Sequence, residues 1–177
     1  MRKSLVEISN LSIGYSNKRG KLVYVLKNVS LQIKPGETLG IVGESGCGKS
    51  TLGQAMMGFL RTGSKVLGGN VDFAGNDMFS LSVHQLESIR GKKIALIPQN
   101  AGKALTPTMR VGKQIMEAIR INPDLPGDTA EKQMIKLLSQ VRLPEPEVMA
   151  KRYPHGLSGG QQQRVVVAMA IAGKPDM

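Results

Sequence analysis

Aromatic side chains are scarce in this sequence: its 177 residues include three Phe, three Tyr and no Trp. A buried core must therefore be built from aliphatic side chains and from the ten Met residues. Hydrophobic residues make up 41% of the chain and charged residues 21%, a balance typical of globular rather than disordered proteins. The length suits one domain.

Cysteine and long apolar segments are nearly absent. The single cysteine, Cys47, excludes an internal disulfide and favours a reducing compartment. The longest uncharged apolar run covers residues 165–173, which is too short to span a bilayer. Residues 1–10 lack the apolar segment of a secretory signal. We therefore expect a soluble protein whose contact with a membrane, if it has one, is peripheral.

Acidic residues are few relative to basic ones, with 13 Asp and Glu against 24 Lys and Arg and a formal net charge of +11. Such a surplus fits a nucleic-acid surface, an anionic membrane surface, or the loss of an acidic part of the protein. The basic residues are scattered, form no long run, and are not interleaved with aromatic residues. Nucleic acid is therefore a disfavoured partner.

The first half of the chain has the patterns of strands. Residues 6–13 and 29–33 alternate apolar and polar side chains, as half-buried strands do, and residues 68–79 resemble a further strand and turn. Residues 38–42 (TLGIV) and 92–98 (KKIALIP) are short apolar runs, which predict strands buried on both faces. We expect a strand-rich core.

Helical patterns follow these strands. A first amphipathic stripe is formed by Leu52, Ala55, Met56 and Phe59, which are spaced at helical intervals. From about residue 102 to residue 155 the chain is rich in helical patterns and prolines, with a second stripe at Met134, Leu137, Leu138 and Val141. The sequence therefore predicts an α/β fold in which the strand-rich core carries a helical insertion.

A glycine-rich segment, GESGCGKS at residues 43–50, matches the pattern G-x-x-x-x-G-K-[ST]. Backbone N–H groups can surround a polyphosphate only if the loop curls tightly, and Gly43, Gly46 and Gly48 permit that curl. A buried strand is expected before the loop and an amphipathic helix after it, which disfavours a chance glycine-rich turn. We call residues 43–51 the phosphate loop.

Two polar residues of the phosphate loop have expected tasks. Lys49 bridges the β- and γ-phosphates of a bound nucleotide, and Ser50 binds its Mg²⁺ ion. The helix that begins near Lys49 points its positive end at the phosphates. Cys47 stands at a variable position of the loop, and we interpret it as an unremarkable residue rather than a redox thiol.

A second motif, LSGGQ at residues 157–161, narrows the assignment. With the phosphate loop in the same chain, it resembles the signature of ATP-binding-cassette (ABC) transporter nucleotide-binding subunits. Ser158 is well placed as an N-cap, and a helix is expected from about residue 160 to residue 172. Gly159 and Gly160 let backbone N–H groups approach an anion, so this segment is a second anion-binding helix start. We call residues 157–161 the signature segment.

The resemblance implies a P-loop NTPase core with an N-terminal antiparallel β part and a helical insertion, ATP and Mg²⁺ as cofactors, and a set of site residues. It makes Gln99 similar to the Q-loop glutamine that contacts Mg²⁺ and the attacking water, so that Lys49 and Gln99 are the catalytic candidates. It makes Tyr15 similar to the aromatic residue that stacks on adenine, with Tyr24 as a rival. The implied ATP-binding residues are Tyr15, Gly43, Glu44, Ser45, Gly46, Cys47, Gly48, Lys49, Ser50 and Thr51. The residues implied to bind the ATP of a partner subunit are Leu157, Ser158, Gly159, Gly160 and Gln161.

The resemblance is closest to the importers of peptides and nickel. It implies a second ABC subunit, identical or not, membrane permease subunits, an indirect solute-binding protein, and a place on the cytoplasmic face of the membrane. Two departures are visible: QNAGKALTP follows the Q-loop strand where relatives often have Asp-Pro and later Asn-Pro, and Gly156 stands where Glu is common. We expect an ATP-binding core at residues 1–101, a helical subdomain at 102–156, and the signature with its helix at 157–177.

The sequence contains no apolar strand that ends in Asp-Glu after the signature helix, and neither histidine fits the switch histidine of the family. We therefore expect an incomplete sheet, a truncated product and doubtful hydrolysis by these 177 residues alone. Three functions stay open: an ATPase subunit of an importer, a soluble ABC ATPase that acts on nucleic acid or ribosomes, and a non-catalytic ATP-binding module. The transported solute and the direction of transport stay open as well.

Overall fold

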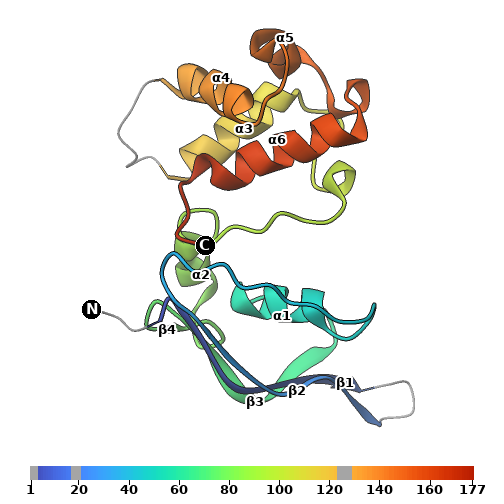
Figure 1. Cartoon of the computed structure of the whole chain (residues 1–177), viewed down its shortest axis with the longest axis vertical. Helices are drawn as coiled ribbons and strands as arrows, with labels where there is room; N and C mark the ends of the chain where they lie inside the picture. The colour runs from blue at the N-terminus through green and yellow to red at the C-terminus, as the bar shows by residue number, and fades with distance from the viewer. Residues whose placement is uncertain (1–3, 17–20, 123–128) are drawn as a thin grey trace. The chain divides into compact units, whose positions relative to one another are not determined.

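Four strands between residues 6 and 77 form an antiparallel sheet (Figure 1). Their order in the sheet is β2-β1-β3-β4. Its strands are β1 (Val6–Ser16), β2 (Leu22–Ile33), β3 (Ser64–Phe73) and β4 (Asn76–Asp77). The strands expected at residues 6–13, 29–33 and 68–79 are therefore confirmed, although β1 and β2 are longer than their alternating patterns. The buried side of β1 carries Val6, Ile8, Leu11 and Ile13.

The computed structural model describes residues 4–16, 21–122 and 129–177, and these form two compact units, Met1–Leu86 and Glu87–Met177. The first unit holds the sheet and helix α1 (Lys49–Met56), and the second holds the helices from α3 onward. Helix α2 (Val83–Ile89) spans the boundary in sequence. The division into residues 1–101, 102–156 and 157–177 stays a prediction.

Helix α1 packs against strands β2 and β3 through the stripe that the sequence indicates. Leu52, Ala55 and Met56 are buried. Phe59 is 49% exposed and lies beyond the end of the helix, so the prediction that it belongs to the stripe was wrong. The reason is Gly58, whose φ of 66° stops the helix. Phe59 N–H then donates to the Gln54 carbonyl and Gly58 N–H to the Ala55 carbonyl, the hydrogen bonds of a Schellman motif.

The buried strand expected at residues 38–42 is absent from the described part of the chain, and this prediction was wrong. These residues have no strand assignment and are exposed, and Val42 reaches 96% exposure. A strand buried on both faces is held by hydrogen bonds to neighbours on its edges. No described segment pairs with residues 38–42, so their apolar character does not by itself produce a strand.

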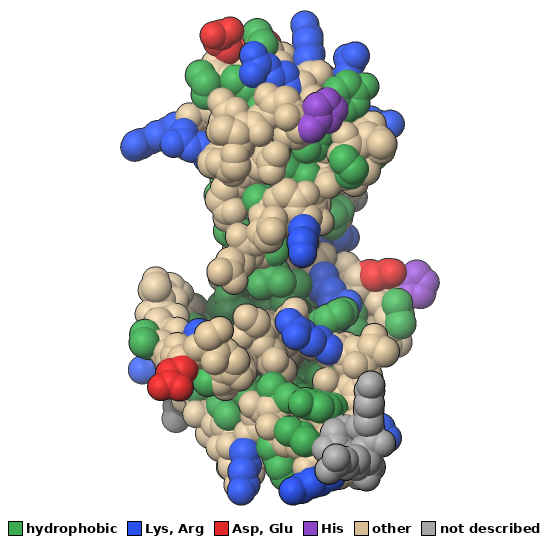
Figure 2. All heavy atoms as spheres, turned by 90° about the vertical axis from the view of Figure 1, so that its right-hand side faces the viewer, with side chains coloured by type: hydrophobic (Ala, Val, Ile, Leu, Met, Phe, Trp, Pro, Cys, Tyr) green, Lys and Arg blue, Asp and Glu red, His purple; other side chains and the backbone are tan. Residues whose placement is uncertain are grey.

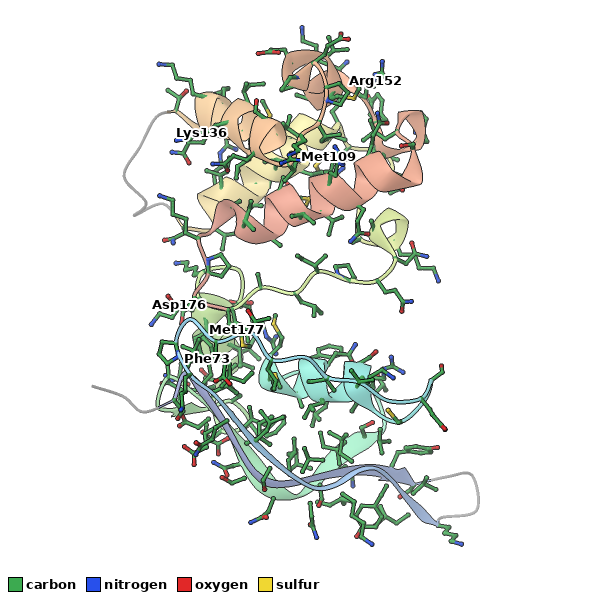
Figure 3. The ribbon with its side chains drawn as sticks, viewed as in Figure 1. Phe73, Met109, Lys136, Arg152, Asp176 and Met177 are labelled. Carbon is green, nitrogen blue, oxygen red and sulfur yellow. The ribbon has the colours of Figure 1, made fainter. Side chains whose placement is uncertain are left out.

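The prediction of a continuous strand at residues 92–98 was also wrong. Only Ile94 is fully buried there, in an isolated parallel bridge with Arg90. Asp176 and Met177, labelled in Figure 3, lie beside this segment: both donate their N–H groups to the Lys93 carbonyl, and Ala95 N–H donates to the Met177 carbonyl at 2.8 Å. The pairing is thus limited to a few residues around Ile94 among those described.

The second unit is a helical cluster around an aliphatic core (Figure 1). Its helices are α3 (Val111–Arg120), α4 (Ala130–Gln140), α5 (Pro146–Lys151) and α6 (Gly159–Ala172), with short 3-10 turns η1 (Ala101–Lys103) and η2 (Pro154–Gly156). Met134 and Leu138 of the expected stripe are buried, and Leu137 and Val141 pack against the core. Gly112 allows close packing, because a Cβ there would lie 2.6 Å from the Met134 sulfur. The helical region that the sequence predicts after residue 102 is therefore confirmed.

Charge and apolar surface are both spread over the units. Figure 2 shows Lys and Arg side chains distributed over the visible face of each unit rather than gathered in one patch. Hydrophobic side chains also reach the surface of the first unit in that view. No helix in the described part of the chain is long and apolar enough to cross a membrane.

Candidate functional site

The phosphate loop is an exposed turn whose conformation depends on glycine. Gly46 and Gly48 have φ values of 85° and 102°, a region that glycine enters without steric cost. A Cβ on Gly48 would lie 2.8 Å from the Leu26 side chain and 2.9 Å from the Val25 carbonyl oxygen. Glycine at position 48 is thus required both by backbone angle and by the close approach of β2.

The loop leads directly into the N-terminus of α1. Gly48 is the N-cap residue, and it offers no side chain to the first turn of the helix. The first intrahelical bond runs from Leu52 N–H to the Gly48 carbonyl at 2.9 Å. The preceding N–H groups of the first turn are orphan donors, which together with the helix dipole favour an anion.

Lys49 closes over the loop that precedes it. Its Nζ donates to the carbonyl oxygens of Gly43 and Glu44, each at 2.7 Å, and contacts the Cys47 sulfur at 3.6 Å. The structure therefore brings the ammonium group to the centre of the expected phosphate site. A phosphate in the loop would offer this cation a charged partner in place of two neutral carbonyls, which is the stronger interaction.

The residues around this centre fit a nucleotide with its Mg²⁺ ion. Glu44, Ser45 and Cys47 are exposed on the loop, and the exposed Ser50 stands in the first turn of α1. A hydroxyl at this position is a suitable Mg²⁺ ligand when phosphate oxygens supply further ligands. No cluster of three or more His, Cys, Asp or Glu side chains that could hold a metal exists among the described residues.

Strand register separates Tyr15 from its rival Tyr24. Along β1, Ile13 and Tyr15 lie on the same face because side chains alternate, and β1 pairs regularly with β3 there. Ile13 pairs with Leu26, whose side chain lies beside Gly48. The register with β2 shifts between Ile13 and Gly14, so that Gly14 pairs with Tyr24 on the opposite face. Tyr15 is therefore on the face of the sheet that meets the phosphate loop, and its ring is partly exposed.

The signature segment begins helix α6 with a complete capping box. Ser158 Oγ accepts from Gln161 N–H at 3.3 Å, and Gln161 Oε1 accepts from Ser158 N–H at 2.9 Å. Leu157 is buried in the helical core, while Ser158, Gly159 and Gly160 are exposed. The helix runs from Gly159 to Ala172, so the predicted cap and helix are confirmed. The buried Leu157 thus anchors the signature segment, and the three small residues that follow it are exposed.

Gln99 and the signature segment share one cavity in the second unit. This open cavity of about 520 Å³ is lined by Gln99, Asn100, Ala101, Gly102, Gly159, Gln162 and Gln163. Asn100 Oδ1 accepts from Lys103 N–H and caps η1, which fixes the chain just after Gln99. Two of the predicted site residues, Gln99 and Gly159, are therefore brought together, and both are exposed.

Three residues of this arrangement carry no signal in the sequence. Leu26 lies beside the phosphate loop, and a leucine on a strand is simply a core residue by pattern. Gln114 is only 3% exposed; its side-chain amide accepts from Thr106 N–H and donates to the carbonyls of Thr106 and Met109. Gln162 donates to two carbonyls before α6. A glutamine inside a helix resembles a solvated surface residue, so only the fold reveals these two clamps.

Comparison with known proteins agrees with the two motifs. The ABC transporter family model matches residues 26–177. In solved structures, a dimeric post-hydrolysis state of the ATP-binding cassette MJ0796 bound to ADP and Pi is similar, with a TM-score of 0.82 and 30% sequence identity over 96% of this chain and 70% of that one. The fold similarity therefore extends over nearly the whole chain.

Curated relatives include transport ATP-binding proteins. The dipeptide transport ATP-binding protein DppD of Bacillus subtilis is 39% identical over 99% of this chain and 52% of its own length. The oligopeptide transport ATP-binding protein OppD of Escherichia coli is 36% identical over 98% of this chain and 51% of its own length. The chain thus spans about half the length of these curated relatives.

Proposed function

The chain belongs to the ABC transporter family, and from that premise we propose that it is the ATP-binding part of a subunit that powers the import of peptides across a membrane. The fold of an ABC ATPase, with its antiparallel β part and its helices, is the scaffold for this function. The observation that carries its ATP-binding part is the presence of two glycine-containing helix starts in one chain, α1 after Gly48 and α6 after Ser158.

The phosphate loop is proposed to hold the polyphosphate of ATP. The first-turn N–H groups of α1 and the ammonium of Lys49 supply positive charge, and Ser50 supplies a hydroxyl for Mg²⁺. Tyr15 is proposed to stack on adenine, supported by its place on the face of the sheet that meets the loop. Gly43, Glu44, Ser45, Cys47 and Thr51 complete the proposed set.

The signature segment is proposed to bind the ATP held by a second subunit. Its capping box satisfies the Gln161 N–H but leaves the exposed backbone around Gly159 and Gly160 able to approach an anion. In a two-fold pair, each subunit uses both of its helix starts, one for its own nucleotide and one for the partner's. The dimeric state of the similar cassette MJ0796 supports this arrangement.

Hydrolysis of ATP by the whole protein is part of the proposal. Mg²⁺, when bound, stabilises the charge that develops on the transferred phosphoryl group. Lys49 is proposed to hold the β- and γ-phosphates, and Gln99 to contact the metal and orient the attacking water. Gln99 is exposed and lines an open cavity, which supports its access to a nucleotide and its metal.

Peptide import is proposed from the relatives. Proteins that transport dipeptides and oligopeptides match almost the whole of this chain at 36% to 39% identity. The proposal adds permease subunits in the membrane and an external solute-binding protein as partners, with the ATP-binding part peripheral on the cytoplasmic face. Both motifs are assigned to nucleotide in this proposal, so the substrate class depends on these relatives alone.

ATP binding is tested by titrating a fluorescent ATP analogue against the protein and its Lys49→Ala variant. Loss of the cation should weaken the affinity at least about 10-fold, since charge-assisted contacts to phosphate contribute roughly 1.5–3 kcal/mol. Lys65→Ala is the matched control, because Lys65 is exposed on β3 of the same unit. An affinity that Lys49→Ala leaves unchanged would contradict the phosphate-loop assignment.

The transport proposal is tested in cells of the source organism. Replacement of the chromosomal gene by its Lys49→Ala form should abolish uptake of labelled di- and tripeptides, while uptake of free amino acids and of nickel stays normal. Lys65→Ala again serves as the control. Normal peptide uptake with impaired nickel uptake would assign the other substrate class, and normal uptake of both would reject import of either.

A further inference from the structure

Gln162 joins two loops of the helical unit through one side chain. Its Nε2 donates to the Pro154 carbonyl at 2.8 Å and to the Leu157 carbonyl at 3.3 Å. Both carbonyls belong to the turn η2 and its exit, which lead into the signature segment. Because Gln162 lies on the first turn of α6 itself, the helix holds the entry of its own chain in place.

The other end of the same amide faces η1. A Cβ on Gly102 would lie 2.9 Å from Gln162 Oε1, so the carbonyl end of the side chain lies against the backbone of this turn. Helix α6 and η1 pack against each other, and η1 begins two residues after Gln99. Any residue larger than glycine at position 102 must displace the Gln162 amide.

We propose that Gln162 is a positioning residue that couples the segment after Gln99 to the signature segment. A shift of η1 moves the Gln162 amide, and the amide carries the Pro154 and Leu157 carbonyls with it. The proposal deepens the proposed function and rests on it, because it states how the state of Gln99 regulates the presentation of the signature to a partner's nucleotide.

The geometry distinguishes Gln162 from its neighbours. The Gln161 side chain belongs to the capping box, and Gln163 lines the open cavity. Of these three glutamines, all within the described residues, Gln162 is the one whose side chain combines donation to η2 with contact to η1. A donor at position 162 is therefore required for the link, whereas an acceptor there would oppose the two carbonyls.

Two charge-changing variants test the donor requirement. Gln162→Glu places a carboxylate against the Pro154 and Leu157 carbonyls, and Gln162→Lys keeps a donor that reaches them. With the full-length protein, Gln162→Glu should raise the ATP concentration for half-maximal dimer formation about 10-fold. This is the effect expected from the loss of one hydrogen bond between the side chain and these carbonyls. Gln162→Lys should stay close to wild type. Dimer formation is measured by analytical ultracentrifugation.

The matched control is Gln140→Glu, which makes the same charge change at the exposed end of α4. It should leave dimer formation unchanged. Binding of a fluorescent ATP analogue to dilute, monomeric protein should also be unchanged in all of these variants, because the phosphate loop belongs to the first unit. A Gln162→Glu protein that dimerises like wild type, or a Gln162→Lys protein as defective as Gln162→Glu, would overturn the inference.

Coupling is separated from local packing by hydrogen exchange. The Leu157 N–H is protected by the Pro154 carbonyl and the Ala104 N–H by the Ala101 carbonyl. Gly102→Ala pushes on Gln162, so exchange at Leu157 should accelerate although the substitution lies in η1. Gly156→Ala, where a Cβ meets nothing within 4 Å, is the control and should leave Ala104 unaffected. Acceleration confined to η1 in Gly102→Ala would overturn the coupling.

Different results would contradict the proposed function and the inference about Gln162. A wild-type protein that binds no ATP analogue contradicts the proposed function and the inference together. A wild-type protein that dimerises with ATP, together with a Gly102→Ala variant whose signature segment exchanges normally, contradicts the inference alone. The exchange measurement needs no nucleotide, so it reports on the link independently of ATPase activity.

Discussion

At the scale of single residues, two glycines five positions apart respond oppositely to an added methyl group. Gly48 has a φ of 102° and no space for a Cβ, whereas Gly53 lies inside α1 and a Cβ there meets nothing within 4 Å. Gly48→Ala should destabilise the protein by about 2 kcal/mol, from left-handed strain and contact with the Val25 carbonyl. Gly53→Ala should stabilise it by about 1 kcal/mol through helix propensity.

Urea unfolding of the two variants, with ATP-analogue titration in parallel, measures both effects. Gly48→Ala should also weaken nucleotide binding, because the loop can no longer hold its curl beside β2. Gly53→Ala should bind the analogue like wild type. Equal stability of the two variants would show that Gly48 tolerates a side chain, and the structural reason for glycine in the loop would then be wrong.

Motif residues were the ones that sequence could predict at this scale. Lys49 and Ser158 stand at fixed distances from glycines, and their tasks follow from local backbone geometry, so spacing alone identifies them. Gln114 and Gln162 act on loops that only the tertiary fold brings to them. Tyr15 could be predicted in part. The residues around it identify it as a candidate, but the face of the sheet on which it lies depends on the pairing of β1 with β2 and β3.

At the scale of elements, the start of α6 combines a stabilising cap with a proposed binding surface, and two substitutions separate these roles. Ser158→Ala removes the acceptor for Gln161 N–H and should cost about 1 kcal/mol of stability. Ser158→Asp keeps a capping oxygen and should retain stability near that of wild type. Its negative charge would face the partner's phosphates, so ATP-dependent dimerisation should be lost in this variant.

Thermal unfolding and sedimentation with ATP together decide this prediction. The contrast matters because a purely structural cap would make dimerisation follow stability in both variants. If Ser158→Asp is stable and still dimerises with ATP, the signature segment does not face a nucleotide. If Ser158→Asp loses stability as Ser158→Ala does, the capping geometry is different from that described.

The elements also show where local patterns stop being informative. Antiparallel strands β1 to β3 and helices α1, α4 and α6 were predictable, because alternation, helical stripes and caps are properties of neighbouring residues. Residues 38–42 and 92–98 have equally strong apolar patterns but form no extended strand among the described residues. A buried strand is hydrogen-bonded to strands that are distant in the sequence. An apolar run therefore predicts that a segment is buried, but it does not show whether a neighbouring strand is present to pair with it.

At the scale of the whole molecule, the two motifs lie in different compact units, with the phosphate loop in the first and the signature segment in the second. The surplus of positive charge, +11 over 177 residues, is spread over both. A dispersed surplus favours general attraction to polyanions over one specific site, so it provides no argument for a nucleic-acid groove. The motifs, rather than the charge, therefore determine which partner a subunit needs.

Complementary variants provide the whole-molecule prediction. If each ATP is held by the phosphate loop of one subunit and the signature segment of the other, Lys49→Ala impairs both sites of its homodimer, and so does Ser158→Asp. A mixed pair has one site with both changes and one site with neither. Mixing equal amounts should therefore restore ATP-dependent dimers in about half of the randomly formed pairs, each with one functional site.

The measurement uses differently labelled full-length variants and fluorescence transfer between them as ATP is added. Transfer should be absent in each single-variant sample and present in the mixture, with about half the nucleotide bound per dimer of the wild type. Mixing Lys49→Ala labelled with both dyes is the control for random association. Because only a shared, two-subunit site predicts restoration, transfer that stays absent in the mixture would mean that each chain binds its nucleotide without the partner's signature segment.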